Sequence, residues 1–437
     1  MARRIGLVDK RGRAVIPGTG RGVTIAMIDT GVAPVAGLAY SNVVLGPDFT
    51  PEDMFDGMRS LDSNGHGTHL AGIMVATDAA WTRGDRRRSA DRTLGIAPDA
   101  TLISIKAGVA DGGTDISQVI AAINWVVEQK QSGTVDIDVL SLAFSADSSQ
   151  SYYTDPLTYA VERAWDAGIV VVVAAGNEGA DQWRLTSPAR DPFVIAVGAS
   201  EMTDINESPA AFTSNGVFRP VDIHAPGASI VSLRNPGSWS DDYNQAGRVG
   251  ESLVRASGTS QATAVVAGAV AVLLERQPSL TPDQVKRLLS DGADTVSTGD
   301  YSWPLRYLNL TTSSTVGVTS KKQWFPPAAG TGSLDDVRGD LRVSLDGVGL
   351  AGEIDIFGND WSGSRWTTDA WTGSRWTGSR WTSDVWAAKS WSGSRWTTGE
   401  WAGSRWTGSR WTATDWSSAG WTGSRWTGSR WTNADWS

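Results

Sequence analysis

Four polar residues with different chemistry stand next to apolar stretches of this chain. They are Asp29 in "AMIDTGV", His66 in "SNGHGTHLAGIMV", Asn177 in "VVAAGNEG" and Ser260 in "SGTSQATAVVAG". A serine hydroxyl becomes a good nucleophile when an imidazole takes its proton, and a carboxylate orients that imidazole. An amide can donate to the oxyanion that follows the attack. Together the four side chains indicate nucleophilic catalysis.

Each of these residues also has a purely structural interpretation. Serine is a common helix N-cap, and the run "AVVAGAVAVLL" behind Ser260 predicts a buried helix. Asp29 is suited to closing a turn, Asn177 is a frequent turn residue, and a lone histidine such as His66 is often structural. Taken singly, the structural interpretation is favoured, whereas the combination of the four types favours catalysis.

Alternating apolar stretches and helical patterns indicate how these residues are positioned. Strands are expected within residues 23–29, 101–107, 135–144, 168–176 and 192–199, and helices within 115–131 and 156–168. Nearly continuous apolar strands between helices predict an α/β fold, with a mostly parallel central sheet and helices on both faces. Ligands of such sheets bind at the carboxyl ends of the strands, which is where the polar residues stand.

Composition limits the classes of function. At 437 residues the chain is longer than a single hydrophobic core usually supports, which indicates one domain with appendages. The net charge of −9 gives no basic surface for nucleic acid, and no apolar run is long enough to span a membrane. The absence of cysteine excludes disulfides and thiolate chemistry.

The C-terminal part of the chain is a repeat. Sixteen of the 23 tryptophans recur every five residues from Trp361 to Trp436, typically as "WTGSR". We therefore divide the chain into a catalytic body at 1–311, a linker rich in Pro, Gly and Asp at 312–360, and a repeat tail at 361–437.

Four sequence blocks resemble a known family. "IDTGV", "NGHGTHLAG", "AAGNEG" and "SGTSQATAVVAG" are similar to the signature blocks of the subtilisin-like serine proteases, the subtilases, over residues 20–292. The resemblance implies a subtilisin-like fold and a serine endopeptidase that hydrolyses peptide bonds through an acyl-enzyme on Ser260. It assigns Asp29, His66 and Ser260 to the catalytic triad and Asn177 to the oxyanion site, with no cofactor.

The same resemblance implies how protein or peptide substrates bind. The family holds an extended peptide as an added β-strand between two segments of the body. The matching segments here contain Gly112 and Gly113 on one side and Ser141, Leu142 and Ala143 on the other. The family commonly has glycine where Ala143 stands, so we expect a narrower pocket that prefers medium apolar side chains.

Two positions depart from the family. Gln261 and Ala264 stand where subtilases usually have methionine and proline. They support an alternative in which the protein is a catalytically inactive relative that binds partners, or attaches to a surface, through its cleft and tail.

The resemblance also bears on metal binding and location. Many subtilases hold calcium after the histidine helix, but this region carries five arginines, for which Asp78, Asp85 and Asp91 are simpler partners, so no metal is expected. An extracellular or cell-surface location is implied, although no signal peptide is visible in this chain. Three alternatives would explain the missing signal peptide. The true start lies upstream, or the chain is a mature or truncated form, or the protein folds inside the cell without a propeptide.

The tail itself has several interpretations. It carries nine basic and five acidic residues, and arginines that precede tryptophan can stack on the indole rings. Exposed indoles favour aggregation, so they are expected to bury against each other, as in a β-solenoid, or against a partner such as a cell-wall glycan. A disordered, low-complexity tail is the other alternative.

Overall fold

The computed structural model describes most of the chain up to residue 355. The described residues are 1, 4–7, 15–16, 18–38, 42–50, 52, 60–77, 95–179, 184–202, 207–297, 303–318, 322–339, 342–345, 348–355, 360, 410–411 and 430–431. In the tail these are only β16 (Arg410–Trp411) and β17 (Arg430–Trp431), which pair in parallel. The predictions of a solenoid or disorder for 361–437 therefore concern residues that lie almost wholly outside the described ones.

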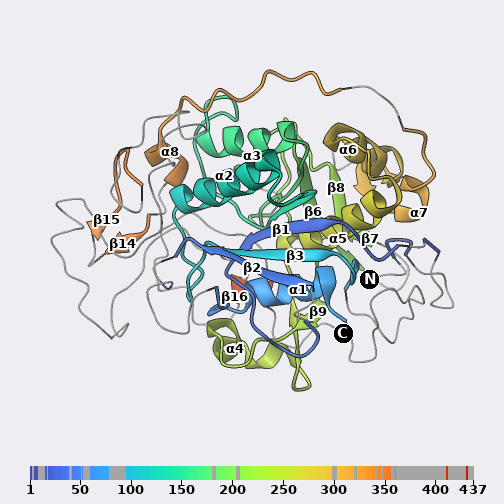
Figure 1. Cartoon of the computed structure of the whole chain (residues 1–437), viewed down its shortest axis with the longest axis horizontal. Helices are drawn as coiled ribbons and strands as arrows, with labels where there is room; N and C mark the ends of the chain where they lie inside the picture. Colours follow the sequence, from blue (N-terminus) through green and yellow to red (C-terminus); the bar gives the residue numbers. More distant parts are fainter. Residues whose placement is uncertain are drawn as a thin grey trace.

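A central β-sheet organises the body (Figure 1). Its order is β12-β13-β8-β6-β5-β4-β1-β3-β2, with β7 beside β6. The strands are β1 (Thr24–Asp29), β2 (Val43–Asp48), β3 (Thr101–Lys106), β4 (Val139–Leu142), β5 (Val170–Ala174), β6 (Ile195–Met202), β7 (Glu207–Pro209), β8 (Ile223–Pro226), β12 (Asp294–Val296) and β13 (Leu305–Tyr307). Within this sheet only the β6–β7 and β12–β13 pairs are antiparallel, which confirms the predicted mostly parallel sheet for the described residues.

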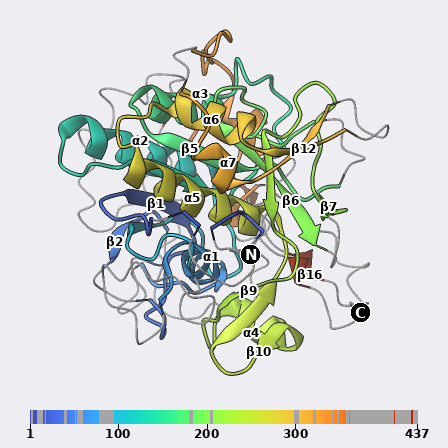
Figure 2. The ribbon, with the colours of Figure 1, turned by 90° about the vertical axis from the view of Figure 1, so that its right-hand side faces the viewer.

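Helices lie on both sides of this sheet. The longer ones are α1 (His66–Val75), α2 (Ile116–Ser132), α3 (Pro156–Asp166), α5 (Thr259–Arg276) and α6 (Pro282–Asp291). Short helical segments are α4 (Trp239–Tyr243), η2 (Gln245–Gly247), α7 (Leu310–Ser313) and α8 (Leu334–Arg338). Figure 1 shows α2 and α3 above β1 and β3, with α1 below them, and α1 packs against α5. Turning the molecule by 90° keeps α2, α3 and α1 in the same vertical order (Figure 2).

Burial on both faces explains the composition of the central strands and of α5. Every residue of β4 and β5 is buried, which suits their continuous apolar sequences. Helix α5 is buried from Thr259 to Leu274, as the run of small apolar residues predicts. A second, antiparallel sheet consists of β9 (Ile230–Leu233), β10 (Arg248–Val249) and β11 (Leu253–Ala256), and β14 (Ser344–Leu345) pairs with β15 (Val348–Gly349).

Candidate active site

Asp29 and His66 meet at the carboxyl edge of the central sheet. Asp29 is the last residue of β1, and His66 is the first residue of α1. The His66 Nδ1 atom lies 2.7 Å from Asp29 Oδ1, and both side chains are buried. A carboxylate at this distance fixes the orientation of an imidazole ring and leaves the other ring nitrogen, Nε2, for proton transfer.

Ser260 lies in the first turn of α5. The N-cap of this helix is Gly258 and no side chain caps it, so the structural interpretation of Ser260 as an N-cap is wrong. The Ser260 Oγ atom donates to the carbonyl oxygen of Ala143 over 3.3 Å. Because backbone N–H groups in the first turn of a helix have no acceptor within the helix, the start of α5 suits a developing negative charge.

Asn177 follows the carboxyl end of β5 and contacts the same helix start. Its Oδ1 accepts hydrogen bonds from Thr259 N at 2.9 Å and from Thr259 Oγ1 at 3.0 Å. The oxygen of the side-chain amide is therefore engaged beside Ser260, and the NH₂ group is the part of this amide that can donate.

The two predicted substrate segments leave the sheet on either side of Asp29, because β1 lies between β4 and β3. Ser141 and Leu142 end β4, and Ala143 follows them. Gly112 and Gly113 lie in a turn after β3. This turn, residues 109–113, is closed by hydrogen bonds from Gly112 N to Val109 O (2.8 Å) and from Val109 N to Gly113 O (3.0 Å). Gly112 has a φ of 83°, a conformation that favours glycine.

The Asp29 carboxylate combines burial with specific donors. Its Oδ1 accepts from Thr30 N at 2.8 Å and from Thr30 Oγ1 at 3.3 Å, in addition to the contact with His66. Burial raises the pKa of Asp29 above its usual value, while His66 and the Thr30 backbone hydrogen bond act in the opposite direction. The carboxylate thus depends on its partners to remain charged.

Sequence and structure comparisons identify the family. The profile described as "Subtilase family" matches residues 20–321. The chain belongs to the subtilase family. Serine protease AprX of Bacillus subtilis is 38% identical over 287 residues, which are 63% of this chain and 62% of AprX, so the chain spans less than two thirds of that relative. Subtilisin DY of Bacillus licheniformis is 32% identical over 284 residues, which are 64% of this chain and 87% of that protein.

Solved structures agree with this assignment. The crystal structure of a cold-adapted subtilisin-like serine proteinase covers 70% of this chain and 97% of its own, with a TM-score of 0.53 and 27% identity. The fold is therefore subtilisin-like, as the sequence resemblance implies, and the chain is homologous to serine proteases.

Asp62 is a residue of this subtilase site that sequence reasoning missed. Its Oδ1 accepts from Gly65 N at 2.7 Å, Asn64 N at 3.1 Å and Thr30 Oγ1 at 2.8 Å. Its Oδ2 accepts from Thr68 N at 2.8 Å and Thr68 Oγ1 at 2.6 Å. One carboxylate thus ties the loop before His66 to the first turn of α1 and to Thr30. The available signal was an acidic residue shortly before the apolar stretch that follows His66, since acidic side chains often cap the start of a helix.

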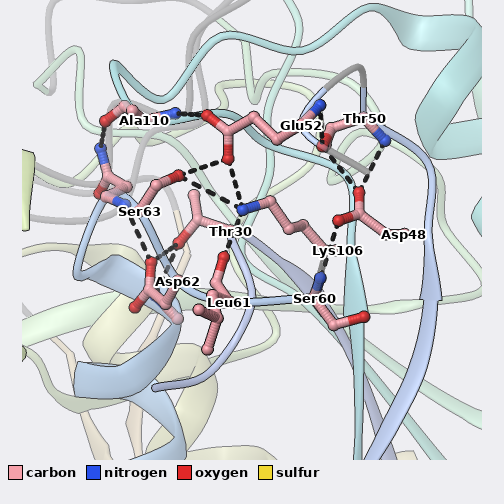
Figure 3. Close-up of polar contacts among 12 residues, drawn as sticks. Thr30, Asp48, Thr50, Glu52, Ser60, Leu61, Asp62, Ser63, Lys106 and Ala110 are labelled. Atoms are coloured by element: carbon pink, nitrogen blue, oxygen red, sulfur yellow. Dashed lines mark hydrogen bonds and ion pairs between the residues drawn. The ribbon is translucent and has the colours of Figure 1, made fainter. Parts of the chain in front are cut away.

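A buried ion pair lies behind this loop (Figure 3). Lys106, the last residue of β3, is wholly buried, and its Nζ donates to Glu52 Oε2 at 2.6 Å, to Ser63 Oγ at 3.3 Å and to the carbonyl of Leu61. The Ser63 hydroxyl also donates to Glu52 Oε2 at 2.6 Å. Residues of the loop before α1 are thereby fixed to the end of β3.

The same cluster reaches residues 109–113, the turn for which the sequence predicts substrate binding. Glu52 Oε1 accepts from Ala110 N at 2.8 Å, and Asn64 Nδ2 donates to Ala110 O at 2.8 Å. Asn64 Oδ1 in turn accepts from His66 N at 3.2 Å. Residues 109–113 are therefore hydrogen-bonded, through Ala110, to the loop that carries the catalytic histidine candidate.

Two other histidines of the subtilase body are buried and neutral. Burial lowers the pKa of His69 on α1 to about 3 and that of His224 on β8 to about 4. The His224 Nδ1 atom lies 3.3 Å from Arg306 O, and its ring centroid is 5.5 Å from that of Tyr307. These contacts fit packing roles.

No group of three or more acidic or histidine side chains able to hold a metal ion occurs among the described residues, and no helix there is long and apolar enough to cross a membrane. Asp78, Asp85 and Asp91 lie outside the described residues.

Proposed function

We propose that this subtilase is a serine endopeptidase with Asp29, His66 and Ser260 as its triad and Asn177 as an oxyanion donor. The observation that carries the proposal is the 2.7 Å contact between His66 Nδ1 and Asp29 Oδ1. Ser260, in the first turn of α5, reaches the same edge of the sheet through its hydrogen bond to the carbonyl of Ala143, which follows β4. Family membership and homology to serine proteases support it independently.

The proposed reaction uses each side chain for one task. His66 Nε2 takes the proton of Ser260 Oγ as the oxygen attacks the peptide carbonyl, and Asp29 stabilises the resulting imidazolium. The Ser260 backbone N–H and the Asn177 NH₂ group donate to the oxyanion. His66 then returns the proton to the departing amine, which leaves an acyl-enzyme on Ser260. Water hydrolyses this ester by the same steps, with His66 again as the base.

Substrate binding follows from the two segments beside Asp29. An extended peptide that pairs with residues 109–113 on one side and 141–143 on the other presents its carbonyl to Ser260. The contact between Ser260 Oγ and Ala143 O supports this placement, since it puts the end of the β4 segment next to the nucleophile. The methyl group of Ala143 narrows the pocket for the residue before the cut, so medium apolar residues are preferred there.

The division into body, linker and tail, an extracellular or cell-surface location, and binding of cell-wall or glycan material by the tail remain part of this proposal. They rest on the composition of residues 312–437 and on the family.

A serine-directed fluorophosphonate probe tests the proposed reaction. We expect stoichiometric labelling of the full-length protein and none of the Ser260→Ala variant, with peptide hydrolysis lost in the same variant. A folded protein that is not labelled would favour the alternative, an inactive relative that binds through its cleft and tail.

A further inference from the structure

The described residues 322–339, just beyond the family match, do not leave the body but run along it. We call residues 322–339 the strap. The strap's Ala329 N donates to Tyr153 O (2.6 Å), Gly332 N donates to Thr154 O (2.7 Å), and Ala328 N donates to Glu162 Oε2 (2.8 Å). Figure 1 shows this orange-brown segment reaching α8 beside α2 and α3.

A wholly buried arginine lies near the end of the strap. Arg338, the last residue of α8, donates from Nε to Asp115 Oδ2 at 2.7 Å and from Nη2 to Asp115 Oδ1 at 3.3 Å. Its Nη1 donates to the carbonyl of Gly352 at 2.8 Å. The two-point pairing of a guanidinium with a carboxylate fixes direction as well as distance, which a lysine does not do.

Asp115 connects this ion pair to the substrate turn. It is the N-cap of α2, where its Oδ1 accepts from Ser117 N at 3.0 Å, and its own N–H donates to Gln118 Oε1 at 2.7 Å. It follows Gly113 by two residues. Arg338 holds the pKa of Asp115 below its usual value although the carboxylate is completely buried, so the cap is charged in the folded protein.

The substrate turn is therefore anchored at both ends by buried ion pairs. Glu52, paired with Lys106, holds Ala110 near its beginning. Arg338 pairs with Asp115, the second residue after the turn. Two glycines lie between these anchors, and glycine leaves the backbone the most conformational freedom. The anchors thus decide how rigidly the turn presents its backbone to a peptide.

We propose that Arg338 is a positioning residue for substrate binding, which holds the turn at 109–113 through Asp115 in the conformation that pairs with the peptide residues before the cut. The inference rests on the proposed function. It makes the strap, which lies beyond the family match at 20–321, a part of the substrate-binding apparatus.

The first test compares substrates of different length. In the full-length Arg338→Met protein we expect kcat/KM to fall about tenfold for a substrate with four residues before the cut, mainly through KM, because about two backbone hydrogen bonds weaken. A substrate with one residue before the cut should keep its kcat/KM within about twofold, per active site counted with the fluorophosphonate probe. For the substrate with four residues before the cut, the kcat/KM of Arg338→Lys should lie between that of the wild type and that of Arg338→Met.

A matched control separates positioning from loss of stability. Arg219 pairs with Asp222 over 2.9 Å just before β8, and Arg219→Met removes a guanidinium that is partly buried and lies in another part of the body. It should leave the ratio of kcat/KM between the two substrates unchanged. The Asp115→Asn/Arg338→Met double variant leaves no buried carboxylate at this site, and asparagine still caps α2. Its melting temperature should therefore recover, while the loss of kcat/KM with the long substrate persists.

Other outcomes would overturn the inference. Equal losses with both substrates, or a full return of long-substrate activity in the double variant, would mean that Arg338 only offsets the charge of Asp115. Hydrogen exchange supplies a readout that does not need catalysis, since the amides of Gly112 and Gly113 should exchange faster in Arg338→Met than in Arg219→Met. Failure of wild-type labelling by the probe would instead refute the proposed function, and unchanged exchange at these amides would refute the inference.

Discussion

Replacing Lys106 by methionine removes the cation that joins β3, the loop before α1 and the turn at residues 109–113. The ammonium group has three donors, and all three are used by Glu52, Ser63 and the carbonyl of Leu61. Breaking a buried ion pair from one side costs about 3–5 kcal/mol, because the remaining charge stays buried. Glu52 keeps the donors Ala110 N and Ser63 Oγ, so we expect the lower end, about 3 kcal/mol.

The assay is urea unfolding, followed by tryptophan fluorescence, of variants made in a Ser260→Ala background, which prevents self-digestion. About 3 kcal/mol corresponds to roughly 6 °C in melting temperature for a body of this size. Lys130→Met is the matched control, because its partner Asp136 is 85% exposed and such pairs contribute about 0–1 kcal/mol.

A second variant distinguishes the charge from the packing. Lys106→Met/Glu52→Gln also removes the charge of Glu52, so most of the lost stability should return. Asp48, whose pKa is raised by burial and lowered in part by Lys106, keeps its hydrogen bonds from Thr50 and Ser60. A loss below about 1 kcal/mol for Lys106→Met alone would refute the reasoning, since it would mean that water or a rearranged loop compensates the Glu52 carboxylate.

Three further predictions concern turnover and pH. Asn177→Ala should lower kcat about 10²–10³-fold with little change in KM, measured by steady-state hydrolysis, and equal effects on both would mean that Asn177 only shapes the cleft. Burial depresses the pKa values of His69 and His224 to about 3 and about 4. At pH values below the ordinary pKa of histidine, the unfolded chain therefore binds more protons than the folded protein. Their contribution to the free energy of unfolding is therefore present at neutral pH and is lost as the pH falls toward 4. Urea midpoints measured between pH 7 and 4 should fall, and constant midpoints would contradict this prediction. Burial and the neighbouring Asp191 raise the pKa of Glu162, so its contribution is full in acid and is lost as the pH rises. Glu162→Gln should thus raise the urea midpoint relative to wild type at pH 9 more than at pH 5, and equal shifts at both would argue against a raised pKa of Glu162.

The fold could be predicted from sequence because its central strands have a local signature. Continuous apolar runs such as "GIVVVVAAG" indicate strands buried on both faces, and the structure has β5 and β4 there with every residue buried. The positions of Asp29 and Asn177 after strands followed from the same patterns. The resemblance to subtilases supplied the roles, which remain proposals.

The polar contacts around the site could not be predicted, since they join residues far apart in the chain. Lys106 and Glu52 are 54 residues apart, and Arg338 and Asp115 are 223 residues apart. Nothing local distinguishes these side chains from exposed charges. Composition likewise predicted a linker at 312–360, because Pro, Gly and Asp suit turns, but it does not reveal which backbone groups find partners on the body. The division into domains stays a prediction.

The distance along the chain between Asp115 and Arg338 also sets an order of events in time. During synthesis at about 5–20 residues per second, Asp115 is made roughly 10–45 s before the guanidinium that pairs with it. Until then, α2 begins with a carboxylate that has no cation of its own to hold it inside the protein. The sheet and its helices can assemble from residues already made, but residues 109–113, the turn we propose to bind the peptide, gain their second anchor only when the strap docks. The proposed peptide-binding turn therefore matures after the fold around it.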